Sequence, residues 1–286
     1  MWTSLVENNP NIVLHQISGR YPKVLVDFNH TFLQKVIYKL LVLILPVFTR
    51  GSYLDRSVFW KKSMLDKAKE LIVKHKIKHV ISTGGPFGVM YFTTLLKKQF
   101  NDIFILNDLR DPWTWGPNWG YPGLNNKRMA YEKNREYLTL KNSDLISVTS
   151  DHNINYLKKN YPEFSDKYIR IPHFFDEEEI LVQKKSVSEK IRLVLYGTIY
   201  QNLDETLDRF FSFLSEHPDK FELDIYSDHT HHLSYIKKHK CTNVRTFSQI
   251  EAKELFKKFK DYDFVFLFNP DYSNDNMSTK FYEIIY

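Results

Sequence analysis

The sequence predicts an α/β protein of two units, each built on a parallel sheet. Apolar runs of strand length alternate with helical patterns along the chain, which is typical of parallel sheets with helices packed on both faces. A polar stretch at residues 176–190 lacks strand character and is interpreted as the linker between the units. A length of 286 residues also suits two domains. We therefore expect a first domain at residues 1–175 and a second at residues 176–286.

The individual elements follow from hydrophobic periodicity and from turn residues. The expected strands are, in chain order, residues 24–28, 79–82, 103–107, 145–149, 168–171, 191–196, 221–226, 244–247 and 263–268. The expected helices in the gaps between them are residues 58–75, 88–99, 127–141, 154–159, 203–216, 231–240 and 252–259.

The segment at residues 32–48 is strongly apolar and carries Lys35, Lys39 and Pro46. It is too short to span a bilayer. We expect a helix that is packed within the first domain. The alternative is an interfacial helix that dips into a membrane surface.

Charge and cysteine content limit the classes of partner and compartment. A net charge of +6 fits an anionic small ligand or an anionic membrane surface, and it is too weak to indicate nucleic acid. The single cysteine, Cys241, excludes a disulfide within this chain and agrees with a reducing compartment. The first residues show no signal-peptide pattern, so we expect a cytoplasmic location.

The most informative segment follows the apolar run at residues 103–106. It contains Asp108, Arg110 and Asp111, and a proline and Trp113 then end the regular structure. In open α/β sheets, ligands bind in the crevice outside the carboxyl ends of the strands. The segment therefore places charged side chains where such a fold carries its chemistry.

A second strand end of this kind lies upstream, after the expected strand at residues 79–82. Thr83, Gly84, Gly85 and a proline follow that strand, and a helix is expected to begin near Gly88. Two neighbouring strand ends with such loops predict a ligand site.

Six short segments together carry a family resemblance. They are STGGP at 82–86, DLRDPW at 108–113, SDLISVTS at 143–150, RIPHFFD at 170–176, LYGT at 195–198 and STKFYE at 278–283. Their order and spacing resemble the bacterial glycosyltransferases of the family 4-like, GT-B type. The resemblance implies two facing dinucleotide-fold domains, of which the second binds a nucleotide-sugar and the first presents the acceptor.

The sequence departs from this family in three places. Family members usually open with a strand and a glycine-rich loop, but residues 1–19 of this sequence contain a single glycine, Gly19. His173 and Phe174 stand where members have a glycine after an asparagine. The sequence ends at Tyr286, inside the expected donor-binding helix, so we expect an incomplete second domain.

The expected donor site lies in the second domain. Gly197 and Thr198 follow the strand at residues 191–196, and a glycine there lets the backbone approach a phosphate near a helix N-terminus. An ordinary tight turn would give the same pattern. By resemblance, Glu283 matches the ribose-binding glutamate of the family and Lys280 the adjacent basic residue. Without the resemblance, these two residues would be interpreted as a surface ion pair.

Asp108, Arg110 and Asp111 allow two interpretations. In the catalytic one, one aspartate orients or deprotonates the acceptor hydroxyl while the other holds Arg110. In the structural one, the three side chains form an ion-pair cluster that only holds a loop.

Acceptor binding is expected at Thr83, Gly84, Gly85 and Trp113. The flat aromatic face of Trp113 suits a sugar ring, although a well-packed loop core would use the same residue type.

Two groups of potential metal ligands are not expected to bind metal. Asp261 and Asp263 form an Asp-x-Asp pair that precedes a strand instead of following one. His229, His231 and His232 have no thiolate nearby and are expected to cap the following helix. We therefore expect no metal and no cofactor besides the nucleotide-sugar substrate.

Taken together, the residues and the resemblance predict a metal-independent glycosyltransferase of the hexosyltransferase type. It would transfer a sugar from a nucleotide-diphosphate sugar to a hydroxyl of a cell-surface saccharide or a lipid-linked acceptor, with a peripheral contact to the inner face of the membrane. One alternative is a nucleotide-sugar epimerase on the same fold. The other is a non-catalytic relative that binds saccharide or membrane.

Overall fold

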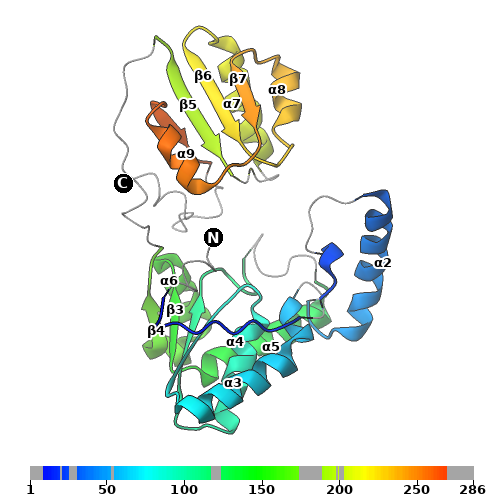
Figure 1. Ribbon diagram of the computed structural model, residues 1–286, viewed down its shortest axis with the longest axis vertical. Coiled ribbons are helices and arrows are strands. Elements are labelled where there is room, and N and C mark those ends of the chain that lie inside the picture. Colours follow the sequence, from blue (N-terminus) through cyan, green and yellow to red (C-terminus); the bar gives the residue numbers. More distant parts are fainter. Residues whose placement is uncertain are drawn as a thin grey trace. The chain divides into compact units, whose positions relative to one another are not determined.

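The computed structural model describes residues 9–19, 21–25, 31–52, 55–116, 124–173, 189–197, 199 and 203–268. The chain forms two compact units, an N-terminal unit of residues 1–172 and a C-terminal unit of residues 173–286 (Figure 1). Each unit contains one four-stranded sheet in which all neighbouring strands are parallel. The α/β class with two parallel sheets, expected from the sequence, is thereby confirmed.

The sheet of the N-terminal unit has the order β1-β2-β3-β4. Its strands are β1 (His79–Thr83), β2 (Phe104–Leu109), β3 (Leu145–Val148) and β4 (Tyr168–Arg170). The connections contain α4 (Gly88–Thr94), η3 (Leu95–Lys98), α5 (Asn126–Asn142), α6 (Asp151–Asn160) and η4 (Pro162–Lys167), and η2 (Arg56–Phe59) and α3 (Lys61–His75) precede β1. α5 and α6 each begin with an N-cap side chain: Asn125 accepts a hydrogen bond from the Arg128 N–H, and Ser150 accepts one from the Asn153 N–H.

Four helices of this unit, α3, α4, α5 and α6, pack on one face of the sheet. Leu109, Ile146 and Val148 point toward α4, α5 and α6 and form one core with them. On the opposite face Ile81 is 72% exposed and Phe104 is 37% exposed. The expectation of helices on both faces is therefore wrong for the described part of this unit. Right-handed crossovers in a sheet whose strand order runs in one direction all return on the same side.

The residues before β1 differ from the expectation in two respects. Lys23–Leu25 form a short 3-10 helix, η1, where a strand was expected at residues 24–28, and residues 26–28 lie outside the described part. The apolar segment forms α2 (Phe32–Phe48), as expected, but Leu45 is its only fully buried residue. Nine large apolar side chains of α2 are exposed: Phe32, Leu33, Val36, Ile37, Leu40, Leu43, Ile44, Val47 and Phe48. A helix packed into the domain core is thus not what the chain forms.

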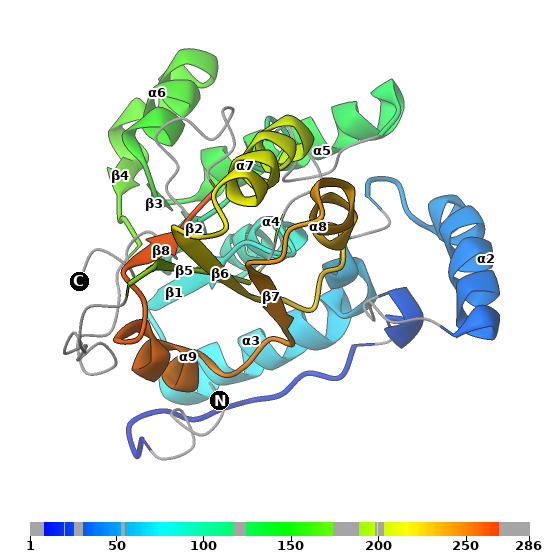
Figure 2. The same ribbon diagram turned by 90° about the horizontal axis from the view of Figure 1, so that it is seen from above.

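The C-terminal unit has a doubly wound sheet of order β7-β6-β5-β8. Its elements are β5 (Ile191–Tyr196), α7 (Asp204–Glu216), β6 (Phe221–Tyr226), α8 (Leu233–His239), β7 (Val244–Phe247), α9 (Ala252–Phe259) and β8 (Phe264–Phe266). α7 and α8 cover one face and α9 covers the other (Figure 2). The direction of winding reverses between β5 and β8, which places the topological switch point of this sheet there.

No helix in the described residues combines the length and the apolar character that are needed to cross a bilayer.

Candidate functional site at the carboxyl edges of the two sheets

Asp108 lies at the carboxyl edge of the N-terminal sheet, between two hydroxyl residues. β2 extends two residues beyond the expected end, so that Asp108 pairs with Thr83 of β1 and with Ser147 of β3. The Ser147 hydroxyl donates to Asp108 Oδ1 at 2.6 Å, and the Thr83 hydroxyl donates to Oδ2 at 3.3 Å. Both carboxylate oxygens are therefore fixed by neighbouring strands.

Arg110 and Asp111 follow directly, and the charge of Arg110 acts on both aspartates. Arg110 Nη1 lies 3.6 Å from Asp108 Oδ2, so Asp108 is the aspartate that holds the arginine. Burial raises the pKa of the Asp111 carboxyl, and the positive charge of Arg110 opposes this shift. A partly buried carboxyl with a raised pKa can act as a general base, because its pKa is shifted toward neutral pH.

The loop after β1 combines one structural glycine with two exposed residues. The Gly84 N–H donates to the Asp108 carbonyl at 3.1 Å, and a Cβ atom at Gly84 would lie 2.9 Å from Phe87 and Met90. Gly85 has φ +92° and open space around its Cα, and Thr83 is exposed. Thr83 and Gly85 are thus accessible beside Asp108, whereas Gly84 serves the packing of the loop.

Trp113 lies in the core, where its ring cannot offer a face to an acceptor sugar. It has no exposed surface, and it stacks on Phe87 with ring centroids 5.4 Å apart. Its indole N–H donates to Glu132 at 3.3 Å. The expected acceptor contact of Trp113 is therefore corrected to a role in fixing the loop after β2.

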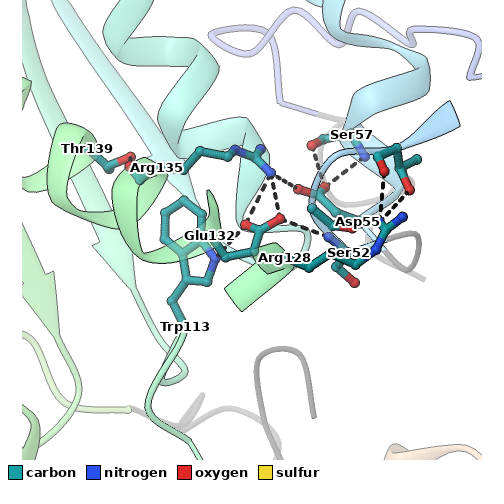
Figure 3. Close-up of polar contacts among 10 residues, drawn as sticks. Ser52, Asp55, Ser57, Trp113, Arg128, Glu132, Arg135 and Thr139 are labelled. Atoms are coloured by element: carbon teal, nitrogen blue, oxygen red, sulfur yellow. Dashed lines mark hydrogen bonds and ion pairs between the residues drawn. The ribbon is translucent and has the colours of Figure 1, made fainter. Parts of the chain in front are cut away.

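The sequence analysis missed a buried charge cluster on α5, which Figure 3 shows. Arg135 Nη1 lies 3.1 Å from an Asp55 carboxylate oxygen and 3.1 Å from Glu132 Oε1, and all three side chains are buried. The Ser52 N–H donates to Glu132 at 2.9 Å, and the Ser57 N–H donates to Asp55 at 3.1 Å. Two segments that are distant in sequence, residues 52–57 and α5, therefore meet at one arginine.

A close contact at Gly88 and a third carboxylate, that of Glu136, connect this cluster to the candidate site. A Cβ atom at Gly88 would lie 2.2 Å from Arg135 Nη2, so the start of α4 fits against the cluster only as glycine. Glu136, one residue further along α5, accepts hydrogen bonds from the Thr114 and Tyr161 hydroxyls. Burial raises the pKa of Glu136 to about 6. Through Trp113 and Thr114, α5 holds the loop that begins with Asp111.

One sequence signal could have indicated this cluster. The buried residues of α5 are Glu132, Arg135, Glu136, Thr139 and Leu140, which follow the spacing of a single helix face. Because four of the five are polar, hydropathy assigns this face to solvent. The available signal was the charge pattern of α5, in which Glu132 has Arg135 three positions after it and Arg128 four positions before it, on the helix that follows a tryptophan-rich loop.

In the C-terminal unit, Gly197 lies at the carboxyl end of β5, next to the switch point. It has φ +74°, and its N–H donates to the Tyr226 carbonyl at 2.8 Å. The first turn of α7 carries its own acids, and Asp204 accepts from Tyr235 and from His231 of the neighbouring segment. These hydrogen bonds lower the pKa of Asp204. The other expected donor-site residues, Thr198, Lys280 and Glu283, lie outside the described residues.

The two groups of potential metal ligands have other contacts. Asp263 precedes β8 and accepts from the Arg192 N–H at 2.9 Å. His231 contacts Asp204, and His232 is the residue that precedes the first turn of α8. Across the residues that the structure covers, no group of three or more His, Cys, Asp or Glu side chains could hold a metal ion.

Comparisons with known proteins give matches in structure only. No protein-family model and no curated protein matches the sequence. A glycosyltransferase from Rickettsia africae is similar, with a TM-score of 0.52 and 12% identity over 72% of this chain and 55% of that chain. Starch synthase IV from Arabidopsis thaliana, bound to ADP and acarbose, gives a TM-score of 0.48 and 11% identity over 75% of this chain and 56% of that chain. A UDP-N-acetylglucosamine 2-epimerase gives a TM-score of 0.45 and 12% identity over 73% of this chain and 55% of that chain.

This chain therefore spans only 55 to 56% of the length of these three chains, of which the starch synthase chain is a catalytic domain. The likeness to the Rickettsia enzyme agrees with the two parallel sheets and with the doubly wound order of the C-terminal unit. The chain has a GT-B-like α/β fold built from two Rossmann-like units.

Proposed function

We propose that the chain belongs to a metal-independent glycosyltransferase of the family 4-like type, which uses a nucleotide-diphosphate sugar as donor. The observation that carries the proposal is Gly197 at the switch point of the doubly wound sheet. Ligands of open α/β sheets bind at such points, and a glycine allows a phosphate to approach the backbone. By resemblance, Lys280 would neutralise the leaving diphosphate and Glu283 would accept the ribose hydroxyls.

The N-terminal unit would supply the acceptor side of the reaction. Asp111 takes the proton of the acceptor hydroxyl as the bond from that oxygen to the anomeric carbon forms. The bond from the anomeric carbon to the diphosphate breaks, and the nucleoside diphosphate leaves. Asp108 holds Arg110 in place beside Asp111, which supports this division of roles. The acceptor is proposed to be a saccharide or a lipid-linked saccharide.

Calorimetric titration with UDP, ADP and GDP in the presence of EDTA tests the donor site. We expect at least one of them to bind, and Gly197→Ala to weaken that binding because a side chain is strained at this backbone angle. Gly85→Ala is the matched control, since Gly85 also has a positive φ but lies in the other unit. Absence of binding by all three nucleotides contradicts the proposal. Binding that requires added manganese or magnesium contradicts the metal-independent form.

Incubation with the donor sugar of the bound nucleotide separates transfer from epimerisation. Without acceptor, a glycosyltransferase leaves the sugar configuration unchanged or slowly releases the nucleoside diphosphate. An epimerase instead converts the nucleotide-sugar into its epimer, which NMR of the sugar protons detects.

A further inference from the structure

The exposed side of α2 is apolar over nearly half of its circumference. At 3.6 residues per turn, its nine exposed apolar side chains fall on one continuous arc of about 160°. The arc runs from Phe32 through Leu43, Leu40 and Ile44 to Phe48, and no polar side chain interrupts it. We call this arc the exposed apolar face of α2.

α2 is apolar on its exposed side, where an ordinary surface helix is polar. The less exposed side is mixed, because Gln34 and Tyr38 lie there together with Leu41, Val42 and Leu45. Lys35 and Lys39 are exposed and border the apolar face one helical turn apart. Surface helices of globular proteins turn their apolar stripe inward, so this arrangement needs an apolar environment outside the unit.

The helix is attached to the unit at its C-terminal end. Arg128 of α5 donates to the carbonyl oxygens of Thr49 and Gly51 at 2.8 and 2.5 Å, and also to that of Pro46. A cation at the C-terminus of a helix interacts favourably with the helix dipole. The attachment fixes the end of α2 and leaves its apolar face outward.

We propose that the exposed apolar face of α2 inserts into the interfacial region of an anionic lipid bilayer, with Lys35 and Lys39 against lipid phosphates. Charge supports a lipid partner, because residues 31–52 contain three basic side chains and no acidic one. A protein interface has an apolar core with a polar rim around it, whereas the charged side chains of α2, Lys35 and Lys39, lie along one border of this face and carry one sign of charge. Seventeen residues give a length of about 25 Å, less than the ~30 Å core of a bilayer, so the helix lies in the membrane plane.

Vesicle flotation of the full chain tests the apolar part of the proposal. We expect stronger binding to vesicles of phosphatidylcholine mixed with phosphatidylglycerol than to phosphatidylcholine alone. Leu43→Glu should weaken binding at least about tenfold, because a carboxylate would enter the interface. Val73→Glu is the matched control on α3, where Val73 is 66% exposed, and it should bind like the unchanged chain. Equal loss in both variants, or no binding of the unchanged chain, overturns the proposal.

Paired lysine variants test the electrostatic part. Lys35→Gln with Lys39→Gln should lower binding to the anionic vesicles by about fivefold for each lysine and leave binding to phosphatidylcholine unchanged. Lys158→Gln with Lys159→Gln on α6 is the control and should change neither. An unchanged preference for anionic vesicles in the first pair contradicts the role of Lys35 and Lys39.

Light scattering without lipid distinguishes a membrane from a second copy of the chain. We expect the same molar mass for the unchanged chain and for Leu43→Glu, and matching circular-dichroism melts show that both are folded. A dimer that Leu43→Glu converts to monomers would assign the exposed apolar face of α2 to a protein interface and overturn the proposal.

Discussion

Replacing Arg135 by methionine is expected to destabilise the N-terminal unit by about 3–5 kcal/mol. The guanidinium is 3% exposed and lies 3.1 Å from oxygens of two carboxylates that are fully buried. Methionine keeps much of the side-chain volume but leaves Asp55 and Glu132 in the interior with no cation between them. Hydrogen bonds from Ser52 and Ser57 still stabilise these carboxylates, which places the expected loss toward the lower end of that range.

Urea unfolding followed by tryptophan fluorescence measures this loss in the right unit. All five tryptophans precede residue 120, so their emission reports on the N-terminal unit. At about 2–4 °C per kcal/mol, the melting temperature should fall by roughly 10 °C. Arg170→Met is the matched control, because the ion pair of Arg170 with Asp151 is largely exposed and should contribute less than about 1 kcal/mol.

A double variant makes the test specific for the ion pair. Adding Glu132→Gln to Arg135→Met removes one of the two uncompensated charges and should recover part of the lost stability. If Arg135→Met costs no more than Arg170→Met, the carboxylates do not depend on the arginine, and the argument for a charge cluster fails.

Three further predictions concern the same loop and its supports. The pKa of Glu136 is raised from 4.5 to about 6, so the folded unit binds this proton more tightly than the unfolded chain does. The free energy of unfolding should therefore fall by about 2 kcal/mol as the pH rises from about 4.5 to 6. Urea unfolding at several pH values measures this decrease, and Glu136→Gln should lack it. Gly88→Ala should lower the melting temperature by several degrees, because its Cβ would lie within 2.3 Å of buried charged groups, and an unchanged value would contradict the packing. Asp111→Asn should slow sugar transfer about a hundredfold at constant melting temperature, because Arg110 keeps Asp108 as its partner; a large loss of stability would instead assign Asp111 a structural role.

Hydrophobic periodicity was sufficient for most of the C-terminal unit. The sequence predicts β5, β6, β7 and α9 with the bounds that they have in the structure. Val194 of β5 contacts α9, whereas Leu193 and Leu195 contact α7, so both faces of the strand are apolar. A strand that is covered on both sides reads as one continuous apolar run, and its ends are sharp.

The candidate site was predictable as a neighbourhood but not in its roles. Asp108, Arg110 and Asp111 are adjacent in sequence, and parallel pairing brings Thr83 beside them. The pairing partner Ser147 comes from a third strand, and only the three-dimensional register shows that it holds Asp108. The choice between the two aspartates depended on the contact of Arg110 with Asp108, and the spacing of these residues in sequence does not show it.

One error and one omission of the sequence analysis have the same physical origin. The apolar α2 was expected in the domain core, where the structure does not place it, and the buried polar face of α5 was not identified. A charge is stable inside when another segment supplies its counter-charge, and the partners of Arg135 include Asp55, which is remote in sequence. An apolar face is stable outside when its surroundings are not water. In both helices the deciding partner lies beyond the local sequence window.

These two helices are also connected to each other. Arg128 and Glu132, one turn apart on α5, bind the two ends of the short segment from Thr49 to Ser52 that follows α2. The next turns of α5 hold the loop of Asp111 through Trp113 and Thr114. A displacement of α2 at a membrane surface would therefore act on the same helix that positions the proposed general base.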